Sequence, residues 1–285
     1  NDVVNWRRKS SRTESELQLT PLSVTGNPGW ERGQIFGMPL GAAAITFRLK
    51  DGILRTEPVH CTVGTGHIDV MAQWDLKRSE VQLAPGSRIQ NMEFSRELCR
   101  QWMGYIAPML TDATAVDGKL SVRLQRLRYF TDHPYQSEIM GKISIHHVSA
   151  SAGESILPFF QVLERISKRS LADRHVELPP QDVEVRMSDG FVEHDGLQMD
   201  VANNLVSSSG KVGLNQAVDL ELQIPPERST AHGQGRTLTI PVHGTITSPR
   251  INISGLIWDV GSREMENRAS QQIDRGLNRL LNGLR

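Results

Sequence analysis

The chain has 285 residues, and its 32 Lys and Arg balance 32 Asp and Glu, so the formal net charge at pH 7 is zero. A strong overall attraction to nucleic acid or to an anionic membrane is therefore not expected. Two cysteines, Cys61 and Cys99, are too few for a disulfide framework. The longest weakly polar run, residues 35–45, is far shorter than the ~20 residues of a membrane-spanning helix.

The first third of the chain predicts an entry segment followed by a β unit. Residues 1–32 are polar and rich in helix breakers, whereas residues 33–110 predict a first β unit that ends in a helix. Within this unit, Asp51-Gly52 is typical of a tight hairpin turn, because both residues tolerate positive φ. Pro58 is expected to interrupt the returning strand, since proline cannot donate a ladder hydrogen bond.

Two internal amphipathic helices are predicted from apolar residues at helical spacing. The first runs from Ser95, a plausible N-cap, to about Leu110, and Pro108 is expected to end or kink it. The second covers residues 155–170. It ends before Pro179-Pro180.

Residues 111–285 predict a second β unit that is continuous with the first in one elongated domain. Asp117-Gly118 and Asp189-Gly190 are expected to turn the chain between alternating strands. A C-terminal amphipathic helix is predicted over 262–284. It has two interpretations, a cap on the sheet edge or a surface that contacts a membrane or envelope proteins.

An internal repeat supports a single architecture for both units. Asp51-Gly52 and Asp189-Gly190 are each followed by a glycine, Gly66 or Gly210, that precedes an aspartate by nine residues. We therefore predict a mainly β fold: a long, curved antiparallel sheet forming a β-groove, with the accessory helices named above.

No catalytic constellation is present in the sequence. The nine histidines show no zinc-ligand spacing, and ordinary surface histidines are favoured over a metal site. His147 is the exception, because alternation places it on an apolar strand face, where a buried, hydrogen-bonded histidine is expected. The serine clusters lack the Gly-x-Ser-x-Gly of a nucleophile elbow. The chain is thus predicted not to be an enzyme and to need no cofactor or metal.

One stretch of the second unit carries a family resemblance. It contains Asp189-Gly190, then Ser209-Gly210-Lys211-Val212-Gly213-Leu214, Val218-Asp219-Leu220 and Ile224-Pro225, and it ends with Ile240-Pro241-Val242-x-Gly244-Thr245-Ile246-x-x-Pro249. This pattern resembles the C-terminal part of AsmA-like envelope proteins, the group that includes TamB and related bridge-like lipid-transfer proteins. The match is best over residues 180–255 and fainter over 33–90.

The resemblance implies a non-enzymatic lipid-transfer or outer-membrane-assembly module in the periplasm of a bacterial envelope. It also implies a tether to the inner membrane through a segment absent from this chain, and a phospholipid or other acyl lipid as partner. No nucleic acid is expected. The alternative is an extracytoplasmic β-sandwich, a scaffold or adhesion module without lipid, whose apolar faces pack against helices or a second sheet. The residues predicted to line the groove are Ile68, Val70, Trp74, Leu76, Val212, Leu214, Val218, Leu220, Leu222, Ile224, Leu238, Ile240, Val242 and Ile246.

Overall fold

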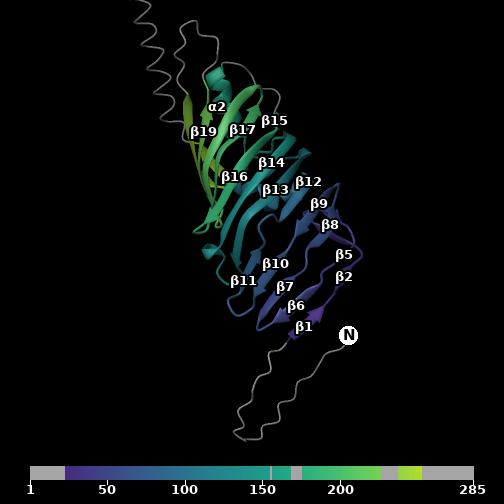
Figure 1. The fold of residues 1–285 in the computed structure, drawn as a ribbon. Coiled ribbons are helices and arrows are strands. Elements are labelled where there is room, and N and C mark those ends of the chain that lie inside the picture. The colour runs from purple at the N-terminus through teal and green to yellow at the C-terminus, as the bar shows by residue number, and fades with distance from the viewer. Residues whose placement is uncertain (1–22, 155, 168–174, 226–236, 252–285) are drawn as a thin grey trace, which may run out of the picture.

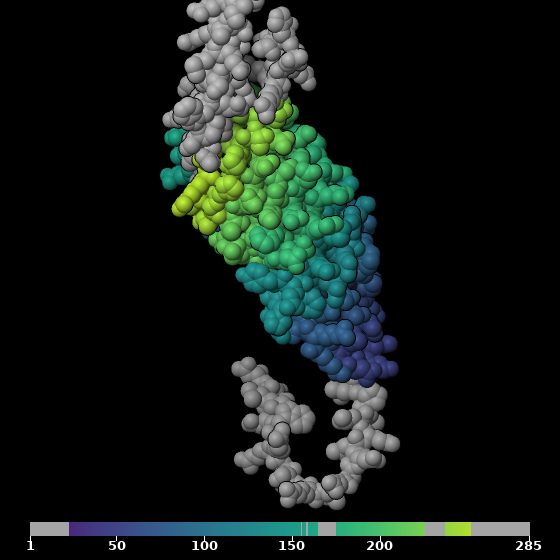
Figure 2. All heavy atoms as spheres, turned by 90° about the vertical axis from the view of Figure 1, so that its left-hand side faces the viewer, coloured from purple at the N-terminus to yellow at the C-terminus, as the bar shows by residue number. Residues whose placement is uncertain are grey.

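The computed structural model describes residues 23–154, 156–167, 175–225 and 237–251. Within these ranges, nineteen strands pair into one antiparallel sheet and two short strands form a separate pair. The predicted mainly β fold with few helices is therefore confirmed. The described body is elongated, with the N-terminal strands at one end and β19 toward the other (Figures 1 and 2).

The N-terminal part of the sheet consists of short strands. The turn at Asp51 and Gly52 has φ values of 56° and 85°, as a two-residue hairpin requires. The predicted interruption at Pro58 is confirmed, because pairing stops at Thr56 and resumes at Val59. The strands are β1 (Ser23–Gly26), β2 (Gly29–Trp30), β3 (Gly33–Ile35), β4 (Met38–Leu40), β5 (Ala43–Ala44), β6 (Phe47–Lys50), β7 (Ile53–Thr56), β8 (Val59–Val63), β9 (Gly66–Val70), β10 (Ala72–Asp75), β11 (Glu80–Leu83) and β12 (Arg88–Glu93). The entry segment predicted over 1–32 thus contributes β1, which pairs with β6.

The C-terminal part is an antiparallel meander of longer strands. It contains β13 (Ala115–Phe130), β14 (Glu138–Ser151), β15 (His175–Leu178), β16 (Gln181–Ser188), β17 (Phe191–Val201), β18 (Asn204–Gly213), β19 (Ala217–Ile224), β20 (Leu238–Thr245) and β21 (Ser248–Ile251). The first half of β13 pairs with β12 and its second half pairs with β11. The N-terminal sheet has two branches. One runs from β11 through β10, β7 and β6 to β1, and the other runs from β12 through β9 and β8 to β4. Strand β13 joins both branches to the meander.

Two local predictions on β13 and β14 are wrong. Asp117-Gly118 does not turn the chain, because it lies inside β13, where Gly118 lets β14 approach: a Cβ there would lie 2.3 Å from the His147 carbonyl oxygen. His147 is exposed and does not lie on the apolar face. A bulge inserts His146 between the pairs Leu120–Ile145 and Lys119–His147, and this extra residue turns His147 to the other side.

The two internal helices lie where the sequence predicts them, but the first is broken. Helix α1 (Arg96–Gln101) is capped by Ser95, whose Oγ accepts a hydrogen bond of 3.0 Å from the Leu98 amide. The 3₁₀ turns η1 (Met103–Tyr105) and η2 (Pro108–Leu110) follow, and Pro108 begins the second of them. A third turn, η3 (Pro134–Gln136), connects β13 to β14, and α2 (Leu157–Ser167) follows β14. The helix predicted at 262–284 lies outside the described residues.

The core lies between these helical segments and one face of the sheet, which we call the inner face. Leu98, Met103 and Leu110 of the first segment and Phe159 and Leu163 of α2 are at most 2% exposed. They belong to the same hydrophobic cluster as the inward-facing residues of β13 to β20. The opposite face of the sheet, the outer face, carries mainly polar side chains.

The two copies of the internal repeat share the alternation of apolar and polar side chains, but their strands are connected differently. Gly66 and Asp75 lie in β9 and β10, and no hairpin turn separates them. Gly210 and Asp219 lie in β18 and β19, on either side of a turn. The equal spacing therefore reflects two different arrangements.

Candidate functional site

A row of apolar side chains crosses the N-terminal end of the inner face. Cross-strand pairing places Val24 opposite Leu49, and Leu49 opposite Leu54. Trp74 lies between Leu54 and Val81 in the same register. Val81 in turn pairs with Tyr129 on β13. These six residues, on six adjoining strands, are called the apolar row below.

The apolar row is only partly buried. Val24 and Trp74 are each 40% exposed, and the other four side chains are half-buried. Leu76, two residues after Trp74 in the turn that follows β10, is 43% exposed. Among the described residues, no member of the row belongs to the core cluster or to the half-buried residues packed against it. Contiguous apolar surface of this kind is characteristic of binding sites.

A neighbouring row runs across the sheet from this open region into the core. Its members pair in the order Leu83, Leu127, Ile139, Met187, Val192, Val212 and Val218. Leu83, Leu127 and Ile139 are half-buried, whereas exposure is 7% at Met187 and 0% at Val212. The inner face is therefore one continuous apolar surface whose two ends differ only in how far they are covered.

The predicted lining residues differ in how far they are covered. Trp74 and Leu76 are exposed, and Ile68, Val70 and Leu214 are half-buried. The others are 9% exposed or less and belong to the core cluster: Val212, Val218, Leu220, Leu222, Ile224, Leu238, Ile240, Val242 and Ile246. We call this second set the covered region and the apolar row with Leu76 the open region.

The covered region is closed by the helical segments. A Cβ at Gly104 of η1 would lie 3.1 Å from Cγ2 of Ile246, so that turn reaches the far end of the meander. Buried side chains of α2 complete the same cluster. The sequence leaves open whether the apolar strand faces line a groove or pack against other elements. In this half of the sheet they pack against helices.

Sequence reasoning missed five members of the apolar row, all except Trp74. Leu49 and Leu54 could have been paired, because a two-residue turn at Asp51-Gly52 fixes their register. The pairing of Val81 with Tyr129 could not have been predicted, because the two residues are 48 positions apart. It also depends on where β13 changes its partner from β12 to β11.

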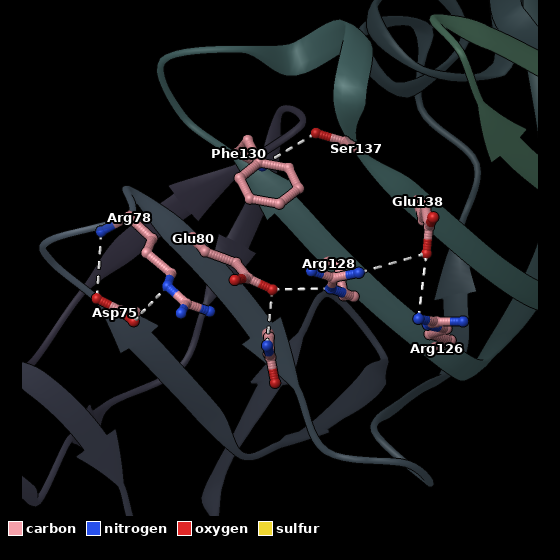
Figure 3. Close-up of polar contacts among 9 residues, drawn as sticks. Asp75, Arg78, Glu80, Arg126, Arg128, Phe130, Ser137 and Glu138 are labelled. Carbon is pink, nitrogen blue, oxygen red and sulfur yellow. Dashed lines mark hydrogen bonds and ion pairs between the residues drawn. The ribbon is translucent and has the colours of Figure 1, made fainter.

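A polar network stabilises the outer side of the sheet beside the open region (Figure 3). Glu80 is 3% exposed, and its Oε1 accepts hydrogen bonds of 2.8 Å from Arg128 Nε and 2.7 Å from Gln82 Nε2. The Arg128 hydrogen bond holds the pKa of Glu80 below its ordinary value, with a smaller contribution from Gln82. Glu138 is 3.2 Å from Arg126 and 3.8 Å from Arg128. These contacts fix β11 against β13.

One buried histidine lies in the middle of the covered half. His194 is 4% exposed, and its Nε2 is 3.1 Å from Ser208 Oγ, while its Nδ1 has no hydrogen-bond partner in the described ranges. Burial lowers its pKa to about 4, because the charged imidazolium is disfavoured away from water. At neutral pH the imidazole is therefore uncharged, and it acts as a structural group in the core.

The outer face is hollowed across β13, β14 and β16 to β19. A depression of about 530 Å³ is lined by charged side chains of both signs, including Arg186, Glu193, Lys211 and Asp219. In the strand register these four alternate in sign, because Glu193 faces Arg186 and Lys211, and Lys211 faces Asp219. Opposite charges in register stabilise neighbouring strands. The charged residues of the depression therefore have a structural role as cross-strand pairs, and their presence does not require a bound ligand.

Within the described residues, no three His, Cys, Asp or Glu side chains are grouped so that they could hold a metal ion. None of the helices in the same ranges is long and apolar enough to cross a membrane. No family model matches the chain, and searches of curated proteins and of solved structures also find no match.

Proposed function

We propose that the protein is a non-enzymatic module that binds an acyl lipid along the inner face of its sheet, at the open region. The observation that carries the proposal is the apolar row: six apolar side chains in cross-strand register, half-buried or exposed, outside the core cluster. A curved, groove-like sheet and a role in lipid transfer or outer-membrane assembly in a bacterial envelope belong to the same proposal.

The chemistry of the row suits an extended hydrocarbon chain. Leu49, Leu54 and Val81 offer branched aliphatic surface, and Trp74 and Tyr129 offer flat aromatic surface. The partner strands lie about 4.8 Å apart, so six strands in register present an apolar stripe roughly 24 Å long. Each acyl CH₂ that leaves water contributes about 0.8 kcal/mol. Affinity would follow chain length, with little selectivity for the headgroup.

The covered region has a structural role in this proposal. Its side chains already pack against α1, η1, η2 and α2, and lipid could reach them only if these segments moved. We therefore assign binding to the open region. Continuity with the covered half, through the row from Leu83 to Val218, provides a rigid support.

Native mass spectrometry of protein purified from cells tests the proposal directly. We expect co-purified lipid on the wild-type chain, and loss of most of it in Trp74→Glu, because a carboxylate in the row is costly to bury beside a hydrocarbon chain. The matched control is Gln73→Glu, which places the same charge one residue away on the outer face, opposite Arg55.

Two results would contradict the proposal. The first is a wild-type chain free of lipid that also fails to take up added fatty acid. The second is equal lipid content in Trp74→Glu and Gln73→Glu.

The alternative of a scaffold module without lipid is favoured by one observation, the dry packing of the covered half. It would require the open region to be covered by protein as well. A lipid-free chain whose Trp74 is shielded from a water-soluble fluorescence quencher would support that function.

A further inference from the structure

We infer that one long edge of the sheet, formed by its hairpin turns, docks onto the surface of a lipid bilayer. The surface consists of Leu76, Lys77, Arg78, Tyr135, Phe191 and Lys211, and we call it the turn rim. The inference rests on the proposed function, because it states where the open region meets its lipid source.

The turn rim follows from the meander topology. The turns at 51–52, 76–79, 131–137, 189–190 and 214–216 all lie at the same ends of their strands, and they follow one another along one side of the sheet (Figure 1). Among the described residues, three of the seven exposed large hydrophobics lie on these turns or next to them: Leu76 at 43%, Tyr135 at 58% and Phe191 at 36%.

Neighbouring turns are joined to one another, so the rim is preorganised. The Leu76 amide donates to the Gly52 carbonyl at 2.9 Å, and the Thr131 amide donates to the Ser79 carbonyl at 2.9 Å. Ser79 Oγ also donates to Asp132 Oδ2 at 2.5 Å. The Leu214 amide donates to the Gly190 carbonyl at 2.8 Å. A rigid row of turns presents its apolar tips without an ordering cost on binding.

The composition of the rim fits a membrane interface better than a polyanion. Tyrosine combines an apolar ring with a polar tip, as interfacial residues do, and Lys211 Nζ lies 4.9 Å from the centre of the Phe191 ring. Acidic side chains lie on the same turns: Asp51, Asp75, Asp132 and Asp189. They offset the lysines and arginines, so attachment depends on the apolar tips, and zwitterionic lipid should serve as well as anionic lipid.

The rim is continuous with the open region. Leu76 belongs to both surfaces, and Trp74 lies two residues before it, near the end of β10. Docking would therefore bring one end of the apolar row to the bilayer, where an acyl chain could pass onto it without crossing water.

Vesicle flotation of the full chain tests the inference, using vesicles of phosphatidylcholine and vesicles that also contain phosphatidylglycerol. We expect the wild type to float with both to a similar extent. Leu76→Glu and Tyr135→Glu should each lower the bound fraction about tenfold, since each replaces an apolar contact with the bilayer by a charge. Leu205→Glu is the matched control, because Leu205 is 49% exposed and lies at the opposite ends of the strands.

Three outcomes would overturn the inference. The first is a wild type that does not float, the second is a loss of flotation in Leu205→Glu as large as that in Leu76→Glu, and the third is that both rim variants float as well as the wild type. The last outcome, together with loss of binding to another protein, would assign the rim to a protein partner. Uptake of free fatty acid, measured in parallel, separates the two claims. If the wild type takes up fatty acid but does not float, the inference about the turn rim is wrong and the proposed function stands. If the wild type takes up no fatty acid, the proposed function itself is contradicted.

Discussion

The open and covered regions of the inner face have the same kind of sequence and different surroundings. Both are built from alternating apolar residues in antiparallel register, and one row of side chains runs from Leu83, beside the open region, to Val218 in the covered region. They differ because the helical segments after β12 and β14 lie over the C-terminal half. Alternation therefore shows that a strand face is apolar, and it does not show what covers that face.

The largest difference between the two regions is expected in stability. Leu222 is 1% exposed in the covered region, and Leu222→Ala should lower the free energy of unfolding by about 2–5 kcal/mol, because it leaves a cavity in the packed core. Urea denaturation measures this change. A loss well under 1 kcal/mol would show that the covered region is not closed.

The buried His194 of β17, beside the covered region, should make stability depend on pH. The pKa of His194 falls from an ordinary 6.5 to about 4 on folding, so the unfolded chain binds the proton more tightly between these values. Lowering the pH from 6.5 to 4 should therefore cost about 3 kcal/mol through this group. His194→Gln should flatten that part of the profile, measured by urea denaturation across this pH range, and an unchanged profile would contradict the burial of His194.

The polar network beside the open region should contribute less. Glu80→Gln removes the closer of the two carboxylate partners of Arg128 and should cost about 1–3 kcal/mol at neutral pH. Because the folded pKa of Glu80 is depressed, its contribution is present above the ordinary carboxyl pKa and is lost as the pH falls through the folded value. The control Glu138→Gln, whose side chain is 45% exposed, should cost less than about 1 kcal/mol. Equal costs for the two variants would contradict the structural role of Glu80.

The smallest change in stability is expected in the open region itself. Leu54 is half-buried and lies outside the core cluster. Leu54→Ala should lower the free energy of unfolding by about 1 kcal/mol or less in the lipid-free chain. The same substitution should weaken fatty-acid binding. A loss as large as that of Leu222→Ala would mean that protein already covers the row.

Much of the fold could be predicted from local patterns. Asp51-Gly52 and Asp189-Gly190 form the expected turns, Pro58 interrupts its strand, and Ser95 caps its helix. These features depend on a few neighbouring residues. By contrast, Gly118 shows that the same dipeptide can lie within a long strand where another backbone approaches closely.

The candidate site was harder to predict because it depends on distant pairing. A single extra residue at His146 was enough to move His147 from the expected apolar face to solvent. The nine lining residues of the covered region were recognisable as apolar and inward. The helical segments that cover them lie elsewhere in the sequence, the first of them more than a hundred residues earlier. Register and cover together decide which apolar face is free to bind.

The most direct test of lipid binding at the open region is photo-crosslinking with a fatty acid that carries a diazirine on its chain, followed by peptide mapping. Adducts should concentrate on β6, β7, β10 and β11, around Leu49, Leu54 and Trp74, and they should be scarce on β19 and β20. Adducts mainly at Val218, Leu220 or Ile240, or an even distribution along the chain, would contradict the account.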